Sequence, residues 1–245
     1  MKIAIISGAS SGIGRCIAKE LDPLGLDELW LIGRNCSKLQ VLSQELCTPA
    51  RIFELDLTRD ESFAFLMRAL SEGQYSVEYL VASAGVGYTG TFESQSYSQI
   101  SSMTKLNCDA LTVLTSIALP YINKDGKILF LASGAGFLPQ PDFAVYAASK
   151  AYVISFARAL REELRERKIK VTAACPGPVD TEFFAGLKNV KEYKKKYLIS
   201  PEKVARGALS AVQKNKAVYT PTFSMKLLRI VAKVLPTRLL LKFSK

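Results

Sequence analysis

Ile3-Ala-Ile-Ile-Ser-Gly-Ala-Ser-Ser-Gly-Ile-Gly14 is the stretch that decides the fold. Ile3 to Ser7 form a short apolar run, which is typical of a buried parallel strand. A helical pattern follows from Ile13 to Leu21, so the glycines lie in a turn from a strand into a helix. Such a turn lets the backbone approach a pyrophosphate, whose negative charge the helix N-terminus favours. We therefore predict a nucleotide-binding turn, with an ordinary tight turn as the alternative. Its candidate residues are Gly8, Ser10, Ser11, Gly12, Ile13 and Gly14.

Beyond this turn, apolar runs and helical patterns alternate along the chain. Strand-like runs are expected at 28–33, 51–55, 77–82, 127–132, 170–174 and 217–220. Helical patterns are expected at about 37–46, 61–70, 98–119, 145–167 and 201–214, with Thr58 to Glu61 as a capping box for the second. This alternation predicts an α/β fold, a single doubly wound Rossmann-type domain with a mostly parallel sheet of about seven strands. The domain is assigned to residues 1–223 and a tail to residues 224–245.

The end of the second strand indicates which dinucleotide would bind. In NAD-dependent Rossmann proteins an acidic residue here binds the ribose 2′-hydroxyl. This chain has Gly33 at that place, and Arg34 follows. A guanidinium pairs well with a 2′-phosphate, which favours NADP(H). Arg15 is expected to add a second positive charge. The alternative is a solvated Arg34 and an enzyme that also accepts NAD(H).

A second group of residues predicts acid–base chemistry. Ser133 follows the apolar run at 127–132, and Tyr146 and Lys150 stand at i and i+4 in the next helical pattern. Both side chains then lie on one helix face, where the ammonium is expected to lower the pKa of the phenol. Ser133 is expected to place its hydroxyl beside the phenol and to hydrogen bond a substrate oxygen. The alternative is a half-buried tyrosine beside a solvated lysine.

With the glycine turn, these residues resemble the short-chain dehydrogenase/reductase family. The family has a Gly-x-x-x-Gly-x-Gly turn and an active site made by a serine and a later Tyr-x-x-x-Lys, which Ser133, Tyr146 and Lys150 match. The resemblance spans roughly residues 1–220. It implies an NADP(H)-dependent oxidoreductase that interconverts a carbonyl and a secondary alcohol, with Tyr146 as general acid and base and Lys150 also holding the nicotinamide ribose.

The resemblance also assigns further residues. Asn107 would hold a water that links the active-site lysine to solvent. The cofactor would be contacted by Asp56 and Leu57 at the adenine, by Ala84 and Gly85 after the fourth strand, and by Pro176, Gly177, Val179 and Thr181 around the nicotinamide. Two positions depart from the family pattern: Ser7 stands where threonine is usual, and Ser83 where asparagine is usual.

An apolar substrate is predicted from the residues around this site. A substrate lid is expected at about 182–200, with a basic stretch from Lys188 to Lys196. Aromatic and aliphatic residues would form the pocket. They are Phe137, Leu138, Phe143, Phe183, Phe184 and Leu187.

Composition excludes several classes of protein and points to one compartment. The chain has no histidine, which excludes a Ser-His-Asp triad and the common zinc sites. Its five cysteines are scattered, which favours a reducing cytosol. No apolar stretch is long enough to span a membrane, and the N-terminus lacks a signal-peptide pattern. We therefore expect a cytoplasmic protein without a metal site.

Positive charge is concentrated near the C-terminus. The net charge is +11, whereas residues 188–245 alone carry 15 basic and 2 acidic groups. In the tail, Lys226, Arg229 and Lys233 stand at i, i+3 and i+7 among apolar residues. This pattern suits peripheral membrane contact. The alternatives are a tail packed over its own pocket or against a partner subunit.

Three functions remain open at this point. The first is the enzyme described above, as a homodimer or homotetramer by family resemblance. The second is a nucleotide-sensing or scaffold protein with no catalytic duty. The third is a membrane-associated reductase of lipid carbonyls. Nucleic-acid binding is not expected, because the basic cluster lacks a recognition motif.

Overall fold

A computed structural model describes residues 1–187 and 197–243. A seven-stranded sheet lies at its centre, in the order β3-β2-β1-β4-β5-β6-β7, and every pair of neighbours is parallel. This confirms the doubly wound α/β prediction. The strands are β1 (Lys2–Ser7), β2 (Glu28–Gly33), β3 (Ala50–Glu54), β4 (Ser76–Ala82), β5 (Ile122–Leu131), β6 (Lys170–Ala174) and β7 (Val218–Tyr219).

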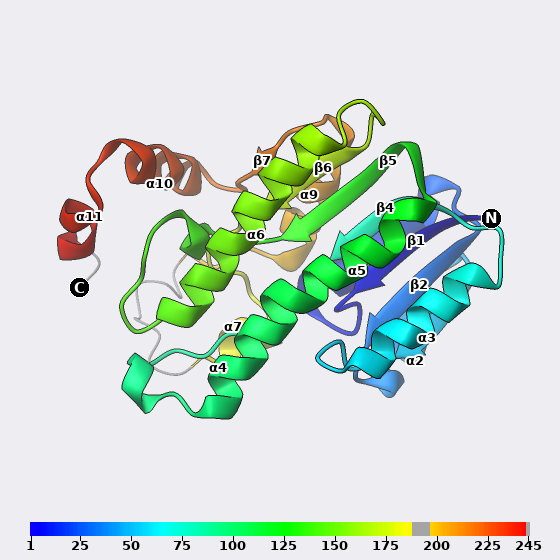
Figure 1. The fold of residues 1–245 in the computed structure, drawn as a ribbon, viewed down its shortest axis with the longest axis horizontal. Coiled ribbons are helices and arrows are strands. Elements are labelled where there is room, and N and C mark those ends of the chain that lie inside the picture. Colours follow the sequence, from blue (N-terminus) through cyan, green and yellow to red (C-terminus); the bar gives the residue numbers. More distant parts are fainter. Residues whose placement is uncertain (188–196, 244–245) are drawn as a thin grey trace.

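Helices cover both faces of the sheet (Figure 1). They are α1 (Gly12–Leu21), α2 (Cys36–Glu45), α3 (Asp60–Ser71), α4 (Tyr97–Thr104), α5 (Ala110–Ala118), α6 (Ala144–Glu163), α7 (Glu182–Ala185), α9 (Pro201–Gln213), α10 (Phe223–Val234) and α11 (Thr237–Phe243).

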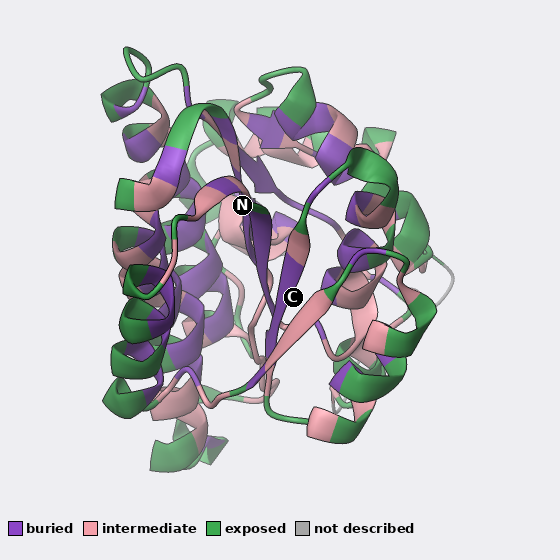
Figure 2. Ribbon diagram, turned by 90° about the vertical axis from the view of Figure 1, so that its right-hand side faces the viewer, coloured by how far each residue is buried: buried purple, intermediate pink, exposed green. Residues whose placement is uncertain are grey.

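The strands face two separate hydrophobic cores. Ile3 and Ile5 of β1 pack in the core beneath α3, α5 and α6, whereas Ala4 and Ile6 pack in the core beneath α1, α2 and α9. The alternation follows from the two-residue period of a strand. Figure 2 shows buried residues running along the strands between the two helical layers. Because both faces are covered, most of the strands contain a continuous apolar run, which is why the sequence could predict their approximate positions.

The strand order reverses between β1 and β4, which positions the site. The chain builds β2 and β3 on one side of β1 and then crosses to β4 on the other side. In open α/β sheets the crevice at the carboxyl ends of two such strands is the usual place for a ligand. Gly8 follows β1 and Ser83 follows β4, so both lie at this crevice.

The helix predicted over 98–119 is interrupted, which corrects the prediction. The α-helix α4 ends at Thr104, a π-helical segment covers Lys105–Asp109, and α5 begins at Ala110. A π-helical turn contains an extra residue and is frequent at functional sites. Asn107 lies inside this segment.

Several predicted boundaries were also wrong for identifiable reasons. The helix α6 ends at Glu163, and not near Arg167, because the chain turns back through Lys168, whose φ is 57°. There is no capping box at Thr58, because its N–H and hydroxyl both bond to the Asp56 carboxylate and α3 begins only at Asp60. Strand β5 starts at Ile122, ahead of the apolar run, through exposed polar residues.

The C-terminal helices α10 and α11 project from one end of the molecule, beside the N-terminus of α6 (Figure 1). Leu235 and Pro236 separate them. Among the helices of the described residues, none is long and apolar enough to cross a membrane.

Candidate active site

One cavity of about 2070 Å³ lies at the carboxyl edge of the sheet. A pocket for a single small ligand has a volume of roughly 300–1,000 Å³, so this cavity has room for a dinucleotide and a second molecule. All residues predicted for catalysis or cofactor binding line it except Gly14, Arg15 and Asn107. The predicted positions at the ends of β1 to β6 therefore meet in one cavity.

The glycine turn is shaped by close backbone contacts. Gly8 has φ +68°, and a Cβ there would lie 2.8 Å from the backbone nitrogen of Ala84. A Cβ on Gly14 would lie 2.3 Å from the carbonyl oxygen of Gly8. Gly14 therefore permits the tight packing of the turn on α1 instead of lining the cavity.

The N-terminus of α1 faces this turn. Ser11 at the N-cap makes no side-chain capping bond, and the first turn of α1 contains no acidic residue. Its first N–H groups are therefore available to an anion, which the helix dipole also favours.

Ser7 joins the two strands at the crevice, a role that sequence reasoning missed. Its hydroxyl accepts hydrogen bonds from the N–H groups of Ser83 and Ala84, at 3.1 and 3.2 Å. The signal was present, because Ser7 ends β1 immediately before the glycine turn. These bonds hold the end of β4 against the end of β1, although Ser83 departs from the family pattern.

Arg34 and Asp56 line the cavity beyond the glycine turn. Burial raises the pKa of the Asp56 carboxyl. Hydrogen bonds from Thr58 and the charges of Arg34 and Arg59 outweigh this effect, so the pKa is lowered overall. Asp56 is thus an anion at neutral pH with Arg34 close to it.

Arg15 does not supply the expected second positive charge in the cavity. Its guanidinium donates to both carboxylate oxygens of Glu45, at 2.6 and 2.7 Å. It is not among the residues that line the cavity.

Tyr146 and Lys150 lie one turn apart in α6, and both are buried. The Lys150 ammonium lies 5.7 Å from the centroid of the Tyr146 ring and donates a 2.8 Å hydrogen bond to the carbonyl oxygen of Leu131. The Phe143 ring stacks on the Tyr146 ring, and the two ring centroids are 4.3 Å apart. The tyrosine and lysine are therefore enclosed together at the end of β5.

The pKa values of the pair follow from this enclosure. Burial raises the pKa of Tyr146 to about 12, although a hydrogen bond with the Ser133 side chain acts to lower it. Burial lowers the pKa of Lys150 to about 8, while the thiols of Cys108 and Cys175 act to raise it. The expected lowering of the tyrosine pKa by the lysine is not seen in this structure, because desolvation dominates both groups.

Ser133 lies at the start of the turn between β5 and α6. Its hydroxyl accepts a 3.1 Å hydrogen bond from the N–H of Ala135, as an N-cap of the 3₁₀ turn Gly134–Phe137. This bond fixes the side chain on the cavity side of the turn, where it also reaches the Tyr146 phenol. Its predicted place beside the phenol is thus present in the structure.

Asn107 lies behind the cavity wall and is fully buried. Its Oδ1 accepts from the N–H of Val86 at 2.9 Å, and its Nδ2 donates to the Val86 carbonyl at 2.9 Å and to the Ser149 hydroxyl at 3.0 Å. A Cβ on Gly85 would lie 3.1 Å from Asn107 Oδ1 and 3.3 Å from Lys150 Nζ. The two side chains therefore converge on Gly85, and the π-helical segment directs Asn107 toward the active-site helix.

The segment after β6 closes the cavity over the glycine turn. Thr181 caps α7 by accepting from the N–H of Phe184, and it donates to the Val179 carbonyl at 3.3 Å. A Cβ on Gly12 would lie 3.2 Å from Thr181 Cγ2, so this segment touches the glycine turn. The predicted lid from 182 to 200 begins here, and its stretch 188–196 lies outside the described residues.

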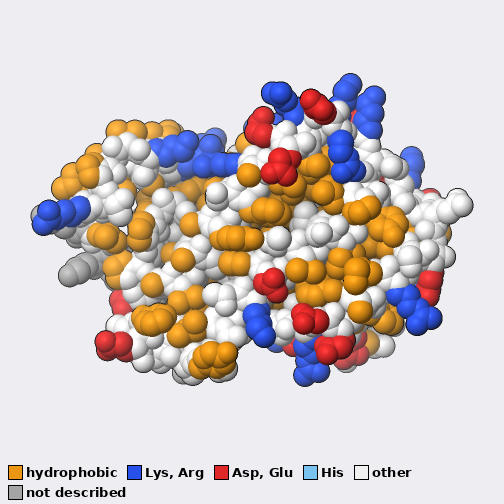
Figure 3. All heavy atoms as spheres, in the orientation of Figure 1, with side chains coloured by type: hydrophobic (Ala, Val, Ile, Leu, Met, Phe, Trp, Pro, Cys, Tyr) orange, Lys and Arg blue, Asp and Glu red, His pale blue; other side chains and the backbone are white. Residues whose placement is uncertain are grey.

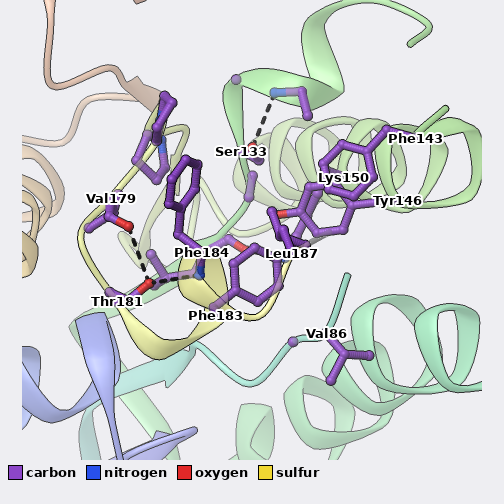
Figure 4. Close-up of a pocket in the computed structure, with 18 of the residues that line it drawn as sticks. Val86, Ser133, Phe143, Tyr146, Lys150, Val179, Thr181, Phe183, Phe184 and Leu187 are labelled. Atoms are coloured by element: carbon purple, nitrogen blue, oxygen red, sulfur yellow. Dashed lines mark hydrogen bonds between the residues drawn. The ribbon is translucent and has the colours of Figure 1, made fainter. Parts of the chain in front are cut away.

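The other end of the cavity is apolar. Figure 4 shows Phe143 beside Tyr146, with Phe183, Phe184 and Leu187 facing them. Leu138 also lines this end, but Phe137 packs against the core beneath α6 instead.

The tail packs over this apolar end, which was one of the alternatives left by the sequence. The sulfur of Met225 in α10 packs closely against the turns at Gly134 and Gly177. A Cβ on Gly134 would lie 2.6 Å from this sulfur, and a Cβ on Gly177 would lie 3.3 Å from it. The apolar residues that the tail contributes to the cavity are Met225, Leu228, Val231, Leu235 and Leu240.

Comparison with known proteins places the chain among oxidoreductases. A family model described as short chain dehydrogenase matches residues 2–192. An uncharacterized oxidoreductase of Staphylococcus epidermidis is 34% identical over 187 residues, which cover 76% of this chain and 81% of that protein. An uncharacterized oxidoreductase of Staphylococcus aureus is 30% identical over 220 residues, which cover 89% of this chain and 93% of that protein.

Solved structures agree with these relatives. A short-chain dehydrogenase from Sphingobium yanoikuyae in complex with NADPH matches with a TM-score of 0.81 at 27% identity, covering 91% of this chain and 89% of that one. A bulky-bulky ketone specific alcohol dehydrogenase from Comamonas testosteroni has the same fold. Its TM-score is 0.76 at 24% identity, covering 96% of this chain and 95% of that one.

Proposed function

This chain belongs to the short-chain dehydrogenase/reductase family of NAD(P)-dependent oxidoreductases, and from this premise we propose that it is an NADP(H)-dependent enzyme that interconverts an apolar ketone and its secondary alcohol. The observation that carries the proposal is the single cavity that contains both the glycine turn and Tyr146. A binding site for the hydride carrier and a group that can exchange a proton thus open into the same space.

The residues at the glycine turn fit a dinucleotide phosphate. Gly8 and Gly14 leave no room for a side chain, and the uncapped N-terminus of α1 favours an anion beside them. Arg34 would hold the 2′-phosphate. The strand β2 ends in Gly33 and not in an acidic residue, whose carboxylate would repel that group. The similarity to a dehydrogenase in complex with NADPH supports this assignment. When bound, the nicotinamide supplies or accepts the hydride.

The remaining cofactor contacts follow the cavity lining. Asp56 and Leu57 would contact the adenine, and Ala84 and Gly85 the middle of the dinucleotide. The nicotinamide end would be held by Pro176, Gly177, Val179 and Thr181. Lys150 would hold the nicotinamide ribose, since its ammonium is already fixed in the cavity wall by Leu131.

Proton transfer at the substrate oxygen is assigned to Tyr146. Its hydroxyl would donate a proton to the carbonyl oxygen in reduction and remove the proton from the alcohol in oxidation. Ser133, whose hydroxyl is fixed beside the phenol, would orient that oxygen and stabilise its developing charge. Lys150 would stabilise the phenolate as it forms. Asn107 would connect the lysine to solvent through a water held near Val86 and Gly85.

The cavity lining supports an apolar substrate. Aromatic rings of Phe143 and Phe183 contact Tyr146, and α10 covers the same end with aliphatic side chains. Such a surface favours a ketone with bulky hydrocarbon substituents over a small polar one.

The cofactor assignment is tested by titration with NADPH and NADH, followed by nicotinamide fluorescence. Loss of a charge-assisted contact costs roughly 1.5–3 kcal/mol, so Arg34→Ala is expected to weaken NADPH binding about tenfold to hundredfold and leave NADH binding unchanged. Arg15→Ala is the matched control, because Glu45 holds that guanidinium away from the cavity. If neither nucleotide binds the wild type, the proposed function fails.

The catalytic assignment is tested with Tyr146→Phe on a panel of apolar ketones. Positioned proton transfer is worth about 10²–10⁴ in rate, so the variant should lose at least that range in kcat and retain NADPH binding. Tyr152→Phe is the control, because this tyrosine lies on the same helix but bonds to Thr112 at an exposed site. A Tyr146→Phe enzyme that keeps most of its activity would refute the assignment.

A further inference from the structure

One face of α10 carries large apolar side chains that nothing in the described structure covers. Phe223, Leu227, Ile230 and Val234 stand at i, i+4, i+7 and i+11, so they form a single stripe along the helix. Their exposed fractions are 79%, 50%, 59% and 74%. We refer to these four residues as the outer stripe.

Three residues of the outer stripe, Leu227, Ile230 and Val234, do not line the cavity, whereas Phe223 at the start of the helix also borders it. Met225, Leu228 and Val231 line the cavity from the adjoining inner face of the helix. The helix therefore meets its packing requirement with one face and exposes a second apolar face. A contiguous exposed apolar surface of this kind marks an interaction site, since a helix that only needs to pack on its domain is polar outside.

Charge beside the outer stripe indicates the kind of partner. Lys226 and Lys233 are exposed and stand at i and i+7 along the flank of the stripe, with Arg229 between them. Residues 223–245 contain six basic residues and no acidic one. Within the described part of the chain, no carboxylate forms an ion pair with these three cations. Figure 3 shows basic side chains bordering hydrophobic ones over this end of the molecule.

We propose that the outer stripe of α10 docks on the surface of an anionic lipid bilayer. An apolar helix face flanked by lysines is suited to the boundary of headgroups and acyl chains, where the lysines meet lipid phosphates. A second copy of this chain that docked through the same surface would offer the cations no carboxylate, because residues 223–245 contain none. An anionic bilayer satisfies both the apolar and the charged part of the surface.

The helix is prepared for this contact before it meets a membrane. Its twelve residues span about 18 Å, and an isolated helix of this length is marginal in water. Here Thr222 caps its N-terminus and its inner face packs on the cavity turns, so the structure already holds it as a helix. Docking would not have to pay for helix formation. This proposal does not depend on the proposed oxidoreductase activity.

The test is co-sedimentation of the full chain with vesicles of phosphatidylcholine alone and of phosphatidylcholine mixed with phosphatidylglycerol. We expect binding to the mixed vesicles at low salt and a decrease as salt is raised. Each lysine near an anionic surface is worth about 1 kcal/mol, so Lys226→Gln with Lys233→Gln should lower the partition coefficient about 30-fold. Lys203→Gln with Lys214→Gln is the matched control, because these exposed lysines lie in α9 and at its C-cap, and their replacement removes the same charge.

A second variant tests the apolar part. Leu227→Ser with Ile230→Ser should also release the protein from the vesicles, while NADPH titration and thermal unfolding show that the fold is intact. The proposal is overturned if the wild type binds neither vesicle, or if the α9 control loses binding as much as the α10 variant does. It is equally overturned if the serine variant converts a dimer to a monomer in size-exclusion chromatography with no effect on vesicle binding, because a second copy then occupies the stripe.

Discussion

Replacing Lys150 by methionine should change how the stability of the protein depends on pH. The Lys150 side chain is buried in the cavity wall, and burial lowers its pKa from 10.5 to about 8. Methionine is of similar length and carries no charge, so it removes the cost of burying the ammonium. It also removes the hydrogen bond to the Leu131 carbonyl, which contributes about 1 kcal/mol.

The size and sign of the effect follow from the pKa. Below about pH 8 the lysine is protonated in the folded and the unfolded chain, so the folded state carries the full cost of the buried charge. Between pH 8 and 10.5 the unfolded chain binds more protons, and the lysine's contribution to the free energy of unfolding rises with pH. The difference between 10.5 and about 8 corresponds to about 3 kcal/mol.

The assay is urea unfolding of the cofactor-free protein and of Lys150→Met at several pH values. The free energy of unfolding of the wild type minus that of the variant should rise by about 2–3 kcal/mol between about pH 7 and about pH 10. Taking the difference removes the contribution of Tyr146 and most of that of the buried thiols, because burial affects the pKa values of the Cys108 and Cys175 thiols more than the Lys150 charge does. Lys203→Met, at an exposed position, should show a difference that stays constant. A constant difference for Lys150→Met as well would refute the reasoning.

Two further predictions concern residues that hold the site together. Asn107→Leu should lower the free energy of unfolding by about 3 kcal/mol, because the three hydrogen bonds of this buried side chain are lost. Chemical denaturation measures this change, and a loss below about 1 kcal/mol would contradict the prediction. Gly8→Ala should destabilise the protein by more than the roughly 1–2 kcal/mol of a left-handed alanine and abolish nucleotide binding, because its Cβ would press on Ala84. Gly25→Ala is its control, with φ +70° and nothing within 4 Å, so equal losses in both variants would show that crowding at Ala84 has no effect.

Much of the fold could be predicted because its signals are local. Each parallel strand is a short apolar run, and turn residues separate it from the next helix, so the strand order alone remained to be found. The π-helical segment at Lys105–Asp109 could not be predicted, because helical periodicity holds on both sides of it. The failed capping box at Thr58 has a similar cause. The hydroxyl can accept from a backbone N–H of the helix or donate to Asp56, and only the folded turn decides for Asp56.

For the candidate site, the sequence predicted the residues and left their environment open. Ser133, Tyr146 and Lys150 were identified by spacing and resemblance. The raised pKa of Tyr146 depends on burial by Phe143 and by Phe183, which lie far apart in the chain. The pairing of Arg15 with Glu45 likewise needs the packing of α1 on α2. Such pKa shifts and ion pairs depend on contacts between residues that are distant in the chain, and the spacing of residues within a motif does not predict these contacts.

The cavity is built from two parts of the chain that can change independently. Its chemical end lies on α6 and the turns after the strands, within the region that matches the family model, whereas Met225 and Leu228 cover it from beyond residue 192. Substitutions on that covering helix would reshape the space available to a guest molecule without changing Tyr146, to which we assign the proton transfer. The C-terminal segment is thus an exchangeable module, and libraries confined to it are the economical route to altered selectivity.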